Sequence, residues 1–488
     1  MIKKNFVKSL RHKAALLGLG LLAPFYLPAQ TVATAPANTL PLTDLSAFKT
    51  PGKTWQLAGD VSADMGKDNV LNAAKGTGVL VNMPDKKNHG VDLYTTAEHG
   101  DVELELDYMV AKGSNSGVYL QGNYELQILD SWGVKSPKAG DNGGVYERWD
   151  ESKPEGQKGY EGYAPRQNAS RAPGLWQHLK VAFQAPKFDA SGKKIENARM
   201  LRVELNGVTI HENLELLGAT RGAMGAEKAT GPLRIQGDHG AVAFRNISIT
   251  NGLKAPQEAS GRNNNRNPVD PILVDAPVNT LLRSFMDLPG QPRVVHAISV
   301  GSPEKVHYTY DLDKGAVIQV WRGNFLDATP MWHERGDGSS RPAGAVQRFG
   351  APVFALAKLA SAQAAWVADS AGTSFRPKGY TLDENEQPTF QYKIYGATVS
   401  DAIRVLDNGQ GLHRELTVQN PAGGELYARL AEGTTIEEKA GMYLVDGKSY
   451  YLRLDDAKNV KPVVRGGANG RQELVVPVRG KVGYTILF

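Results

Sequence analysis

From Trp55 onward the chain alternates short runs of β-forming residues with clusters of Gly, Asn, Asp and Pro, and no long stretch keeps the spacing of an amphipathic helix. Short strands bounded by turn residues are typical of antiparallel sheets packed face to face. The sequence therefore predicts an all-β protein whose first domain is a β-sandwich. The Ala-rich run at residues 354–368 is the only segment for which we expect a helix.

The length of the chain indicates more than one domain. At 488 residues it exceeds what one hydrophobic core ordinarily supports, so two or three domains are expected. Residues 254–270 are polar, rich in Asn and almost free of apolar side chains, as linkers are. We expect a β-sandwich domain over residues 41–250, a linker over 251–270 and a second β-rich domain of unknown role over 271–488.

The first thirty residues have the organisation of a secretory signal peptide. Basic residues precede an apolar run from Ala14 to Leu27 that is short for a membrane span, and small residues near Ala29 offer a cleavage site. We expect residues 1–30 to be removed on export to the periplasm or beyond, which leaves no stable membrane anchor. An uncleaved anchor is the alternative.

Charge and cysteine content exclude several classes of function. The five Lys and Arg residues of the N-terminal segment account for the whole formal charge of +5, so the rest of the chain is near neutral. A near-neutral protein has no electrostatic footprint for nucleic acid. Because the chain contains no Cys, it has no disulfide, thiolate metal site, Cys nucleophile or covalently attached haem.

Two short patterns locate strands inside the first domain. Residues 102–110 read V-E-L-E-L-D-Y-M-V, so the apolar side chains share one face and Glu103, Glu105 and Asp107 share the other. Further along, Asn206-Gly207 between two apolar runs is the strongest short signal for a β-hairpin.

A second hairpin, at residues 118–130, carries polar residues in strands that are otherwise apolar. If Gln121-Gly122-Asn123 forms a three-residue loop, Leu120 pairs with Tyr124 and Tyr119 with Glu125, so each face has one character. We therefore expect Tyr119, Glu125 and Gln127 to line a solvated face, next to the polar face of strand 102–110. Asp130 falls on the opposite parity, so the strand ends or bulges before it, or its role is structural.

Residues 133–174 form one long polar insertion with several aromatic side chains, among them Trp149. Loops of this length are usually functional lids or disordered, and disordered segments are poor in aromatics. The insertion is expected to be a lid or rim.

Several motifs occur together in the first domain: N-S-G-V-Y-L-Q-G at 115–122, Y-E-L-Q-I-L-D-S at 124–131, G-G-V-Y at 143–146, L-N-G at 205–207 and R-I-Q-G-D-H-G at 234–240, followed by F-R-N-I at 244–247. In this order they resemble the secreted 3-keto-disaccharide hydrolase domain, also described as a 3-keto-glucoside 1,2-lyase and hydratase domain, over about residues 41–250. Here the last motif is one glycine longer than usual, which can displace His239.

The resemblance implies a concanavalin A-like jelly roll whose concave face binds a sugar already oxidised to a ketone at C3. Such a ketone acidifies the proton on C2, so a base can remove it, the glycosidic oxygen leaves C1, and water then completes a net hydrolysis. The chemistry requires a base with a pKa near the working pH and a donor where enolate charge develops. The expected partner is thus a carbohydrate, a 3-keto-sugar.

The candidate site residues follow from this chemistry. The candidate catalytic groups are Glu125, His239 and Lys138. The candidate substrate-binding residues are Tyr119, Gln127, Tyr146, Arg234, Gln236 and Trp149. No cofactor is certain, and a divalent cation held by Glu125, Asp130 and His239 is an alternative source of Lewis acidity.

Two other functions fit the same residues. A retaining glucanase would use Glu125 and Asp130 as its pair of acids, which must converge on one bond. A carbohydrate-binding protein without catalysis would use the aromatic and amide side chains only to hold sugar.

Overall fold

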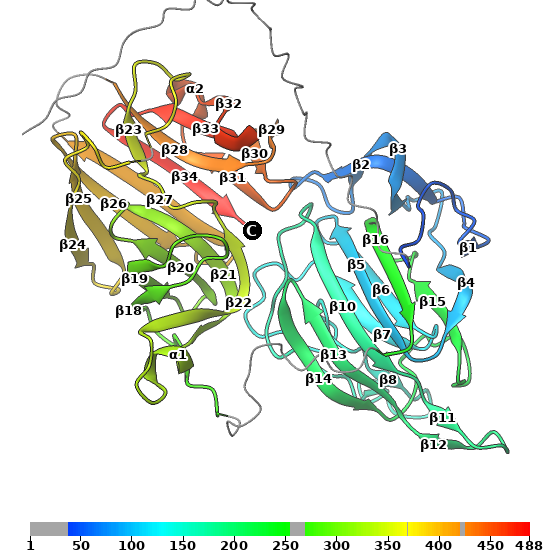
Figure 1. Cartoon of the computed structure of the whole chain (residues 1–488). Helices are drawn as coiled ribbons and strands as arrows, with labels where there is room; N and C mark the ends of the chain where they lie inside the picture. Colours follow the sequence, from blue (N-terminus) through cyan, green and yellow to red (C-terminus); the bar gives the residue numbers. More distant parts are fainter. Residues whose placement is uncertain (1–37, 254–268, 368, 420–424) are drawn as a thin grey trace, which may run out of the picture. The chain divides into compact units, whose positions relative to one another are not determined.

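The computed structural model describes residues 38–253, 269–367, 369–419 and 425–488 (Figure 1). The expected signal peptide at residues 1–30 and most of the expected linker at 251–270 lie outside the described residues. Within the described residues no helix is both long and apolar enough to cross a membrane.

Residues 38–251 form two antiparallel sheets that pack through their apolar faces. The smaller sheet has the order β1-β4-β15-β6-β7. Its strands are β1 Phe48–Lys49, β4 Leu93–His99, β15 Gly231–Ile235, β6 Asn115–Leu120 and β7 Tyr124–Leu129. The larger sheet has the order β14-β13-β10-β5-β16-β3-β2. Its strands are β14 Val208–Leu216, β13 Ala198–Leu205, β10 Gln177–Gln184, β5 Val102–Val110, β16 Val242–Asn251, β3 Leu71–Asn82 and β2 Trp55–Ala63.

The alternation in strand 102–110 correctly predicted which side chains form the core. In β5 the side chains of Val102, Leu104 and Leu106 are buried in the cluster between the sheets, whereas Glu105 is exposed. The same buried cluster contains five side chains of β6 and β7, namely Val118, Leu120, Tyr124, Leu126 and Ile128. The sandwich is therefore held together by period-two patterns in both sheets.

We expected the face of Tyr119, Glu125 and Gln127 to lie next to the polar face of strand 102–110, and this expectation is wrong. Strand β5 belongs to the larger sheet and strands β6 and β7 to the smaller one. Because the sheets pack through their apolar sides, the polar face of β5 points away from the face that carries Glu125. The acidic residues of β5 instead meet cations of their own sheet, as in the contact of Asp107 with Arg245 at 3.1 Å.

Both predicted hairpins are confirmed. Leu205 pairs with Val208, and the two turn residues Asn206 and Gly207 have φ angles of 51° and 81°. Positive φ at both central positions is the geometry of a type I′ turn, which Asn-Gly favours. This hairpin forms one edge of the larger sheet.

Residues 273–488 are again almost entirely β. One sheet contains β17 Leu273–Val274, β21 Ala316–Asp327, β20 Val306–Asp311, β19 Val294–Gly301, β18 Thr280–Met286 and β22 Ser339–Arg348. This sheet closes because β22 pairs with both β18 and β21. A second sheet contains β24 Arg376–Leu382, β25 Pro388–Ile394, β26 Ala397–Val405, β27 Gly411–Gln419, β34 Lys481–Leu487, β31 Tyr450–Leu454, β30 Met442–Val445 and β29 Ile436–Lys439. A third contains β23 Leu356–Lys358, β28 Leu426–Gly433, β33 Gln472–Pro477 and β32 Val463–Gly466.

The helix expected at residues 354–368 is wrong. Its first part is strand β23, which pairs with β28, and Phe354 and Leu356 are buried in the apolar cluster of this region. Burial against a sheet edge has overridden the helix propensity of the alanines, as tertiary context commonly does. The helices of the described residues are single turns, α1 Thr329–Trp332, α2 Ala457–Val460 and a 3-10 turn at Ala468–Gly470.

Candidate active site

The β6–β7 hairpin has the predicted register. Leu120 pairs with Tyr124, Tyr119 with Glu125 and Gly117 with Gln127, around a loop in which Gln121 and Gly122 have positive φ. The side chains of Tyr119, Glu125 and Gln127 therefore lie on the face of the smaller sheet that points away from the core.

Strand β15 extends this outer face on the other side of β6. Arg234 pairs with Tyr119, and the backbone N–H of Gln236 donates to the carbonyl of Gly117 at 2.9 Å. Asp238 lies in a bend beyond the end of β15. The outer face thus carries one row made of Arg234, Tyr119 and Glu125 and a second row made of Gln236, Gly117 and Gln127.

Gly117 forms the floor of this face. A Cβ atom placed on Gly117 would lie 2.2 Å from the Oε1 atom of Glu125, which is far inside van der Waals contact. The carboxylate of Glu125 therefore bends over the backbone of β6 into space that any other residue at position 117 would fill. The absence of a side chain at this one position brings the carboxylate to the middle of the outer face.

Burial dominates the electrostatics of Glu125. Only 3% of the residue is exposed, and burial raises the pKa of its carboxyl to about 7. A hydrogen bond from the hydroxyl of Tyr119 and the charge of Arg234 lower this pKa, while the charges of Asp92 and Asp238 raise it. A carboxyl poised near neutral pH has the property that a general base requires.

Arg234 is occupied by neighbours. Its Nε donates to Asp92 Oδ2 at 2.7 Å, its Nη2 lies 2.5 Å from the same oxygen, and its Nη1 donates to the carbonyl of Gly222. Its guanidinium also lies over the ring of Tyr119, 4.2 Å from the centroid. Arg234 therefore holds Tyr119 and the segment around Gly222 in place and is not a free cation for substrate.

The expectation that this face is solvated is wrong. Tyr119, Glu125 and Gln127 are only 2%, 3% and 7% exposed. Part of the 133–174 insertion runs along β7 as an added edge. The backbone N–H of Gly143 donates to the carbonyl of Gln127, and the N–H of Gln127 donates to the carbonyl of Gly144, both at 2.8 Å. The N–H of Tyr146 donates to the carbonyl of Glu125 at 3.2 Å.

A second covering segment connects β14 to β15. The backbone N–H of Glu125 donates to Thr220 Oγ1 at 3.1 Å, and the N–H of Met224 donates to the carbonyl of Gly122 at 3.0 Å. A Cβ placed on Gly222 would lie 3.6 Å from the hydroxyl of Tyr119. This segment therefore closes the Tyr119 end of the outer face.

The remaining candidates lie at different depths. Gln236 is partly exposed, but its Oε1 atom is buried without a partner, and Oε1 of Gln127 accepts from the N–H of Ile128. His239 is 49% exposed, with Nδ1 hydrogen-bonded to Asp238. Tyr146 is partly exposed on the segment that borders β7.

Two candidates from the insertion lie outside the buried cluster. Lys138 is exposed, and its backbone N–H donates to Asp141. Trp149 belongs to the short strand β8 Arg148–Trp149, which pairs with β9 Gly159–Tyr160, and its indole stacks on the guanidinium of Arg221 at 3.7 Å. The structure shows no hydrogen bond or ion pair between Glu125 and either Lys138 or Trp149.

Asp130 has a structural role. Strand β7 ends at Leu129, and the carboxylate of Asp130 accepts backbone N–H groups from Gly113 at 2.9 Å and Trp132 at 3.3 Å. The metal set of Glu125, Asp130 and His239 is not assembled, since no group of three or more His, Cys, Asp or Glu side chains among the described residues is arranged to hold an ion.

Sequence reasoning missed Asp92, Asp238 and the role of Gly117. Asp92 precedes β4, and only the pairing of Arg234 with Tyr94 reveals that this carboxylate lies beside β15. Asp238 directly precedes the candidate base His239, and the sequence contains no separate signal for its charge. The signal for Gly117 was available, because a glycine inside a strand marks a close approach.

Residues 43–250 match the model of one protein family, the 3-keto-alpha-glucoside-1,2-lyase-like domain. This segment is therefore similar to that family, as the sequence motifs predicted. No curated protein matches the chain.

Solved structures similar to the chain include two candidate glycosyl hydrolases from Parabacteroides distasonis. One is 25% identical and the alignment covers 44% of this chain and 85% of that one, with a TM-score of 0.28. The other is 19% identical, with coverage of 44% and 98% and a TM-score of 0.28.

Proposed function

We propose that this chain, which carries a 3-keto-alpha-glucoside-1,2-lyase-like domain, is an exported enzyme that cleaves 3-keto-glycosides with Glu125 as the base that removes the C2 proton. The observation that carries the proposal is the buried carboxyl of Glu125, with a pKa of about 7, in the middle of the outer face. A base with this pKa is half ionised at neutral pH and still a strong acceptor.

The reaction proceeds in two balanced stages. The C2–H bond breaks and its proton passes to Glu125, while the electron pair forms a double bond between C1 and C2 and the C1–O bond breaks. The departing oxygen takes up a proton and leaves as the free alcohol. Water then adds its oxygen to C1, and a proton returns to C2, so that the net change is hydrolysis.

Neighbouring residues support these steps in the proposal. The hydroxyl of Tyr119 donates to Glu125 and orients its carboxylate, while Arg234 and Asp92 fix Tyr119. The amide nitrogen of Gln127 and the side chain of Tyr146 are the groups proposed to donate to sugar hydroxyls. His239, half exposed and bonded to Asp238, is the group proposed to exchange the leaving-group proton with solvent.

The position of Asp130 argues against a retaining glucanase. That mechanism needs two carboxyl groups about 5 to 5.5 Å apart across one bond. Asp130 lies beyond the end of β7 and its oxygens bind backbone N–H groups, so it cannot serve as partner of Glu125 without rebuilding the loop. A protein that only binds sugar has no need of a carboxyl held near neutral pKa.

The direct test is incubation of the full chain with a 3-keto-disaccharide, with and without added divalent metal. The proposal predicts release of free sugar and a transient ultraviolet absorbance from the enone. The Glu125→Gln variant should retain binding and lose turnover by about 10²-fold to 10⁴-fold, the usual share of a general base. Binding without turnover by the wild-type protein under both conditions would show a lectin instead.

A further inference from the structure

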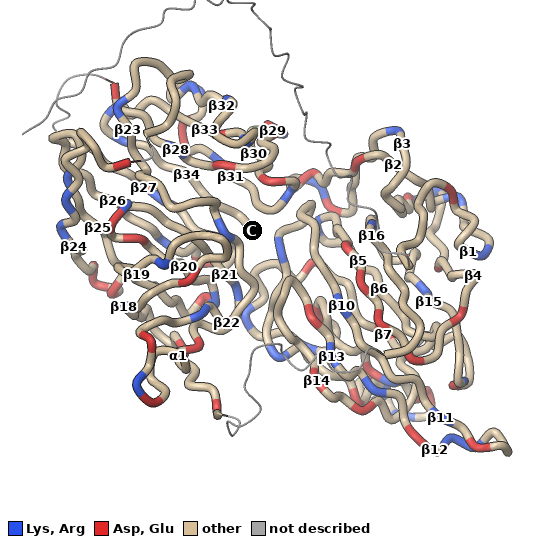
Figure 2. Tube along the Cα trace, in the orientation of Figure 1, with Lys and Arg blue, Asp and Glu red and all other residues tan. Residues whose placement is uncertain are grey.

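The proposed reaction moves negative charge onto the C3 oxygen of the sugar, and Arg234 is not free to compensate it. Lys and Arg are interspersed with Asp and Glu along the described chain (Figure 2). Arg234, on the same face as Glu125, contacts Asp92 with Nε and Nη2, and its Nη1 donates to the carbonyl of Gly222. Lys138 is exposed on the insertion. Among the side chains of this face, neutral donors are therefore left for the C3 oxygen.

Gly117 and Gln127 form a closely spaced pair at the centre of the face. The backbone N–H and C=O of Gln127 bond to Gly144 and Gly143, on the side away from β6. In an antiparallel pair, residues that share no hydrogen bond with each other lie about 4.5 Å apart between Cα atoms, and their side chains are the closer ones. The side chain of Gln127 therefore lies directly beside the space over Gly117.

Two further carboxamides border the same space. Gln236 directly follows β15, where its backbone N–H donates to the carbonyl of Gly117 at 2.9 Å, and its neighbour Ile235 belongs to the core. Asn115 lies two residues before Gly117 on β6, so its side chain points to the outer face. Both carboxamides are therefore next to the space into which the carboxylate of Glu125 bends.

The carboxamides of Asn115 and Gln236 lack partners in the protein. Oδ1 of Asn115 and Oε1 of Gln236 are buried, and neither has a hydrogen-bond partner among the described residues. In the same part of the chain, Oε1 of Gln127 accepts from the N–H of Ile128 at 3.2 Å. Buried polar atoms without a partner are unfavourable and uncommon in folded proteins. Two of them side by side, next to the candidate base, indicate that a ligand supplies the missing bonds.

An α-hydroxyketone fits these groups. A carboxamide presents an N–H donor beside a C=O acceptor. In a 3-keto-glycoside the ketone oxygen at C3 accepts and the hydroxyl at C4 donates, on adjacent ring carbons. When C2 lies at Glu125, C3 and C4 follow in the ring, away from the base. Donors placed where charge develops typically contribute about 10²-fold to 10³-fold to kcat.

We propose that Asn115 and Gln236 bind the C3 oxygen and the C4 hydroxyl of the substrate, and that their N–H groups stabilise the enolate. The proton of C2 passes to Glu125, and the electron pair of the C2–H bond moves toward the C3 oxygen, where the N–H groups donate, before the glycosidic oxygen leaves C1. The inference rests on the proposed function and deepens it, because it assigns the groups that receive the developing charge.

Asn115→Leu and Gln236→Met test the proposal, since each removes a carboxamide and keeps about the same side-chain size. Each variant should lower kcat on a 3-keto-glucoside about 10²-fold. The wild-type chain should prefer this substrate about tenfold or more over its 4-deoxy analogue, and the preference should shrink toward one in at least one variant. Unchanged kcat, or a lower kcat with the full preference retained in both variants, would overturn the proposal.

Thermal unfolding distinguishes substrate contact from a structural role. Neither buried oxygen has a partner to lose, so Asn115→Leu and Gln236→Met should unfold at the temperature of the wild-type chain or above it. A lower unfolding temperature in both variants would show that the carboxamides serve the fold, and would overturn the proposal. Asn72→Leu makes the same change at an exposed position of β3 and should alter neither kcat nor the preference.

Binding of an analogue without a leaving group separates this proposal from the proposed reaction. The probe is 1,5-anhydroglucitol oxidised to the ketone at C3, titrated calorimetrically. If the wild-type chain cleaves no 3-keto-glycoside, the proposed reaction is overturned, and weaker binding of the probe to Asn115→Leu and Gln236→Met still supports the carboxamide contacts. Equal binding to all three chains, or no binding to the wild-type chain, overturns them. Glu196→Gln, an exposed acid of the hairpin β11 Lys187–Phe188 and β12 Lys194–Glu196, should bind the probe as the wild-type chain does.

Discussion

Glu125 combines burial with a titratable group, and this combination affects stability as well as chemistry. A glutamate in an unfolded chain titrates near pH 4.3, whereas burial raises the folded pKa to about 7. Between these values the folded protein holds a proton that the unfolded chain has released. Folding stability should therefore fall as the pH rises from about 4 to about 7, and stay reduced above it.

The Glu125→Gln variant tests this penalty. Glutamine cannot ionise, so at about pH 8 the variant should be more stable than the wild-type chain by roughly 2–4 kcal/mol, and at about pH 4, below both pKa values, the two should be alike. Urea unfolding at both pH values measures the difference, with Glu196→Gln as control. A difference that does not grow with pH would argue against the raised pKa.

Tyr119→Phe separates orientation of the base from substrate contact. The hydroxyl of Tyr119 lowers the pKa of Glu125 through its hydrogen bond, so its removal should raise that pKa further above 7. The ascending limb of the pH profile of kcat/KM should then move to higher pH, by about half a unit to one unit. The control is Tyr380→Phe, an exposed residue of β24. A limb that stays in place would mean that Tyr119 serves only the substrate.

At the scale of the elements, the β6–β7 hairpin was predictable because its signals are local. A period of two and a loop containing Gly122 fix which residues pair, and Asp130 could already be recognised as out of phase. The burial of the hairpin was not predictable. The segments that border it come from Gly143–Tyr146 and from Thr220, about 20 and 95 positions from Glu125 along the chain, and no periodic pattern encodes such contacts.

Gly117→Ala tests whether the floor of the outer face places the carboxylate. The added Cβ would collide with Glu125 Oε1 and push it aside, so kcat/KM should fall by about 10²-fold, the loss that a displacement of about 1 Å can cause. Gly466→Ala is the matched control, because no atom lies within 4 Å of a Cβ at that position and its φ is not positive. Full activity in Gly117→Ala would refute the placement.

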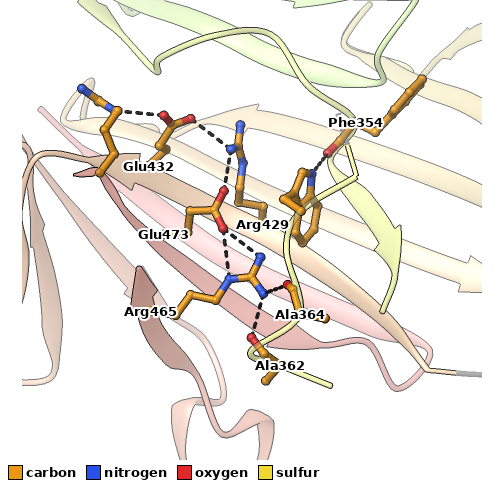
Figure 3. A network of polar contacts seen from close by, with 9 residues as sticks. Phe354, Ala362, Ala364, Arg429, Glu432, Arg465 and Glu473 are labelled. Carbon is orange, nitrogen blue, oxygen red and sulfur yellow. Dashed lines mark hydrogen bonds and ion pairs between the residues drawn. The ribbon is translucent and has the colours of Figure 1, made fainter. Parts of the chain in front are cut away.

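A buried ionic network stabilises the third sheet of the C-terminal region (Figure 3). Glu473 accepts from Arg465 Nε and Nη2 with one oxygen and from Arg429 Nη1 with the other, at 2.8–3.0 Å. Arg465 also donates to the carbonyls of Ala362 and Ala364, and these bonds hold the loop that follows β23 against β32 and β33. Both Arg465 and Glu473 are almost completely buried.

Removal of the shared carboxylate should unfold this region more easily. In Glu473→Gln the buried guanidinium of Arg465 loses its counter-charge, while Arg429 keeps Glu432 at 3.0 Å, and the expected loss of stability is about 3–5 kcal/mol. Glu437→Gln, an exposed acid paired with Lys439 in β29, should change little. Scanning calorimetry of the full chain measures both. An unchanged unfolding temperature for Glu473→Gln would show that the network contributes no net stability.

At the scale of the whole molecule, the sequence predicted an all-β chain because turn residues recur throughout it. Among the described residues, no sheet combines strands from residues 48–251 with strands from 273–487, while the division of the chain into domains stays a prediction. Closure of the first C-terminal sheet could not be predicted, since it depends on the parallel pairing of β18 with β22 across more than fifty residues. The family match lies within residues 43–250, and so do all the candidate site residues.

The central claim, proton removal from C2 by Glu125, is tested most directly by cleavage of a 3-keto-disaccharide in D₂O. Elimination followed by hydration returns a solvent proton to C2, so the released 3-keto-sugar should carry deuterium at C2 when it is analysed at early times by NMR. The Glu125→Gln variant should give neither cleavage nor exchange. Rapid cleavage by the wild-type chain with the original hydrogen still at C2 would contradict the account and indicate ordinary glycosidic hydrolysis.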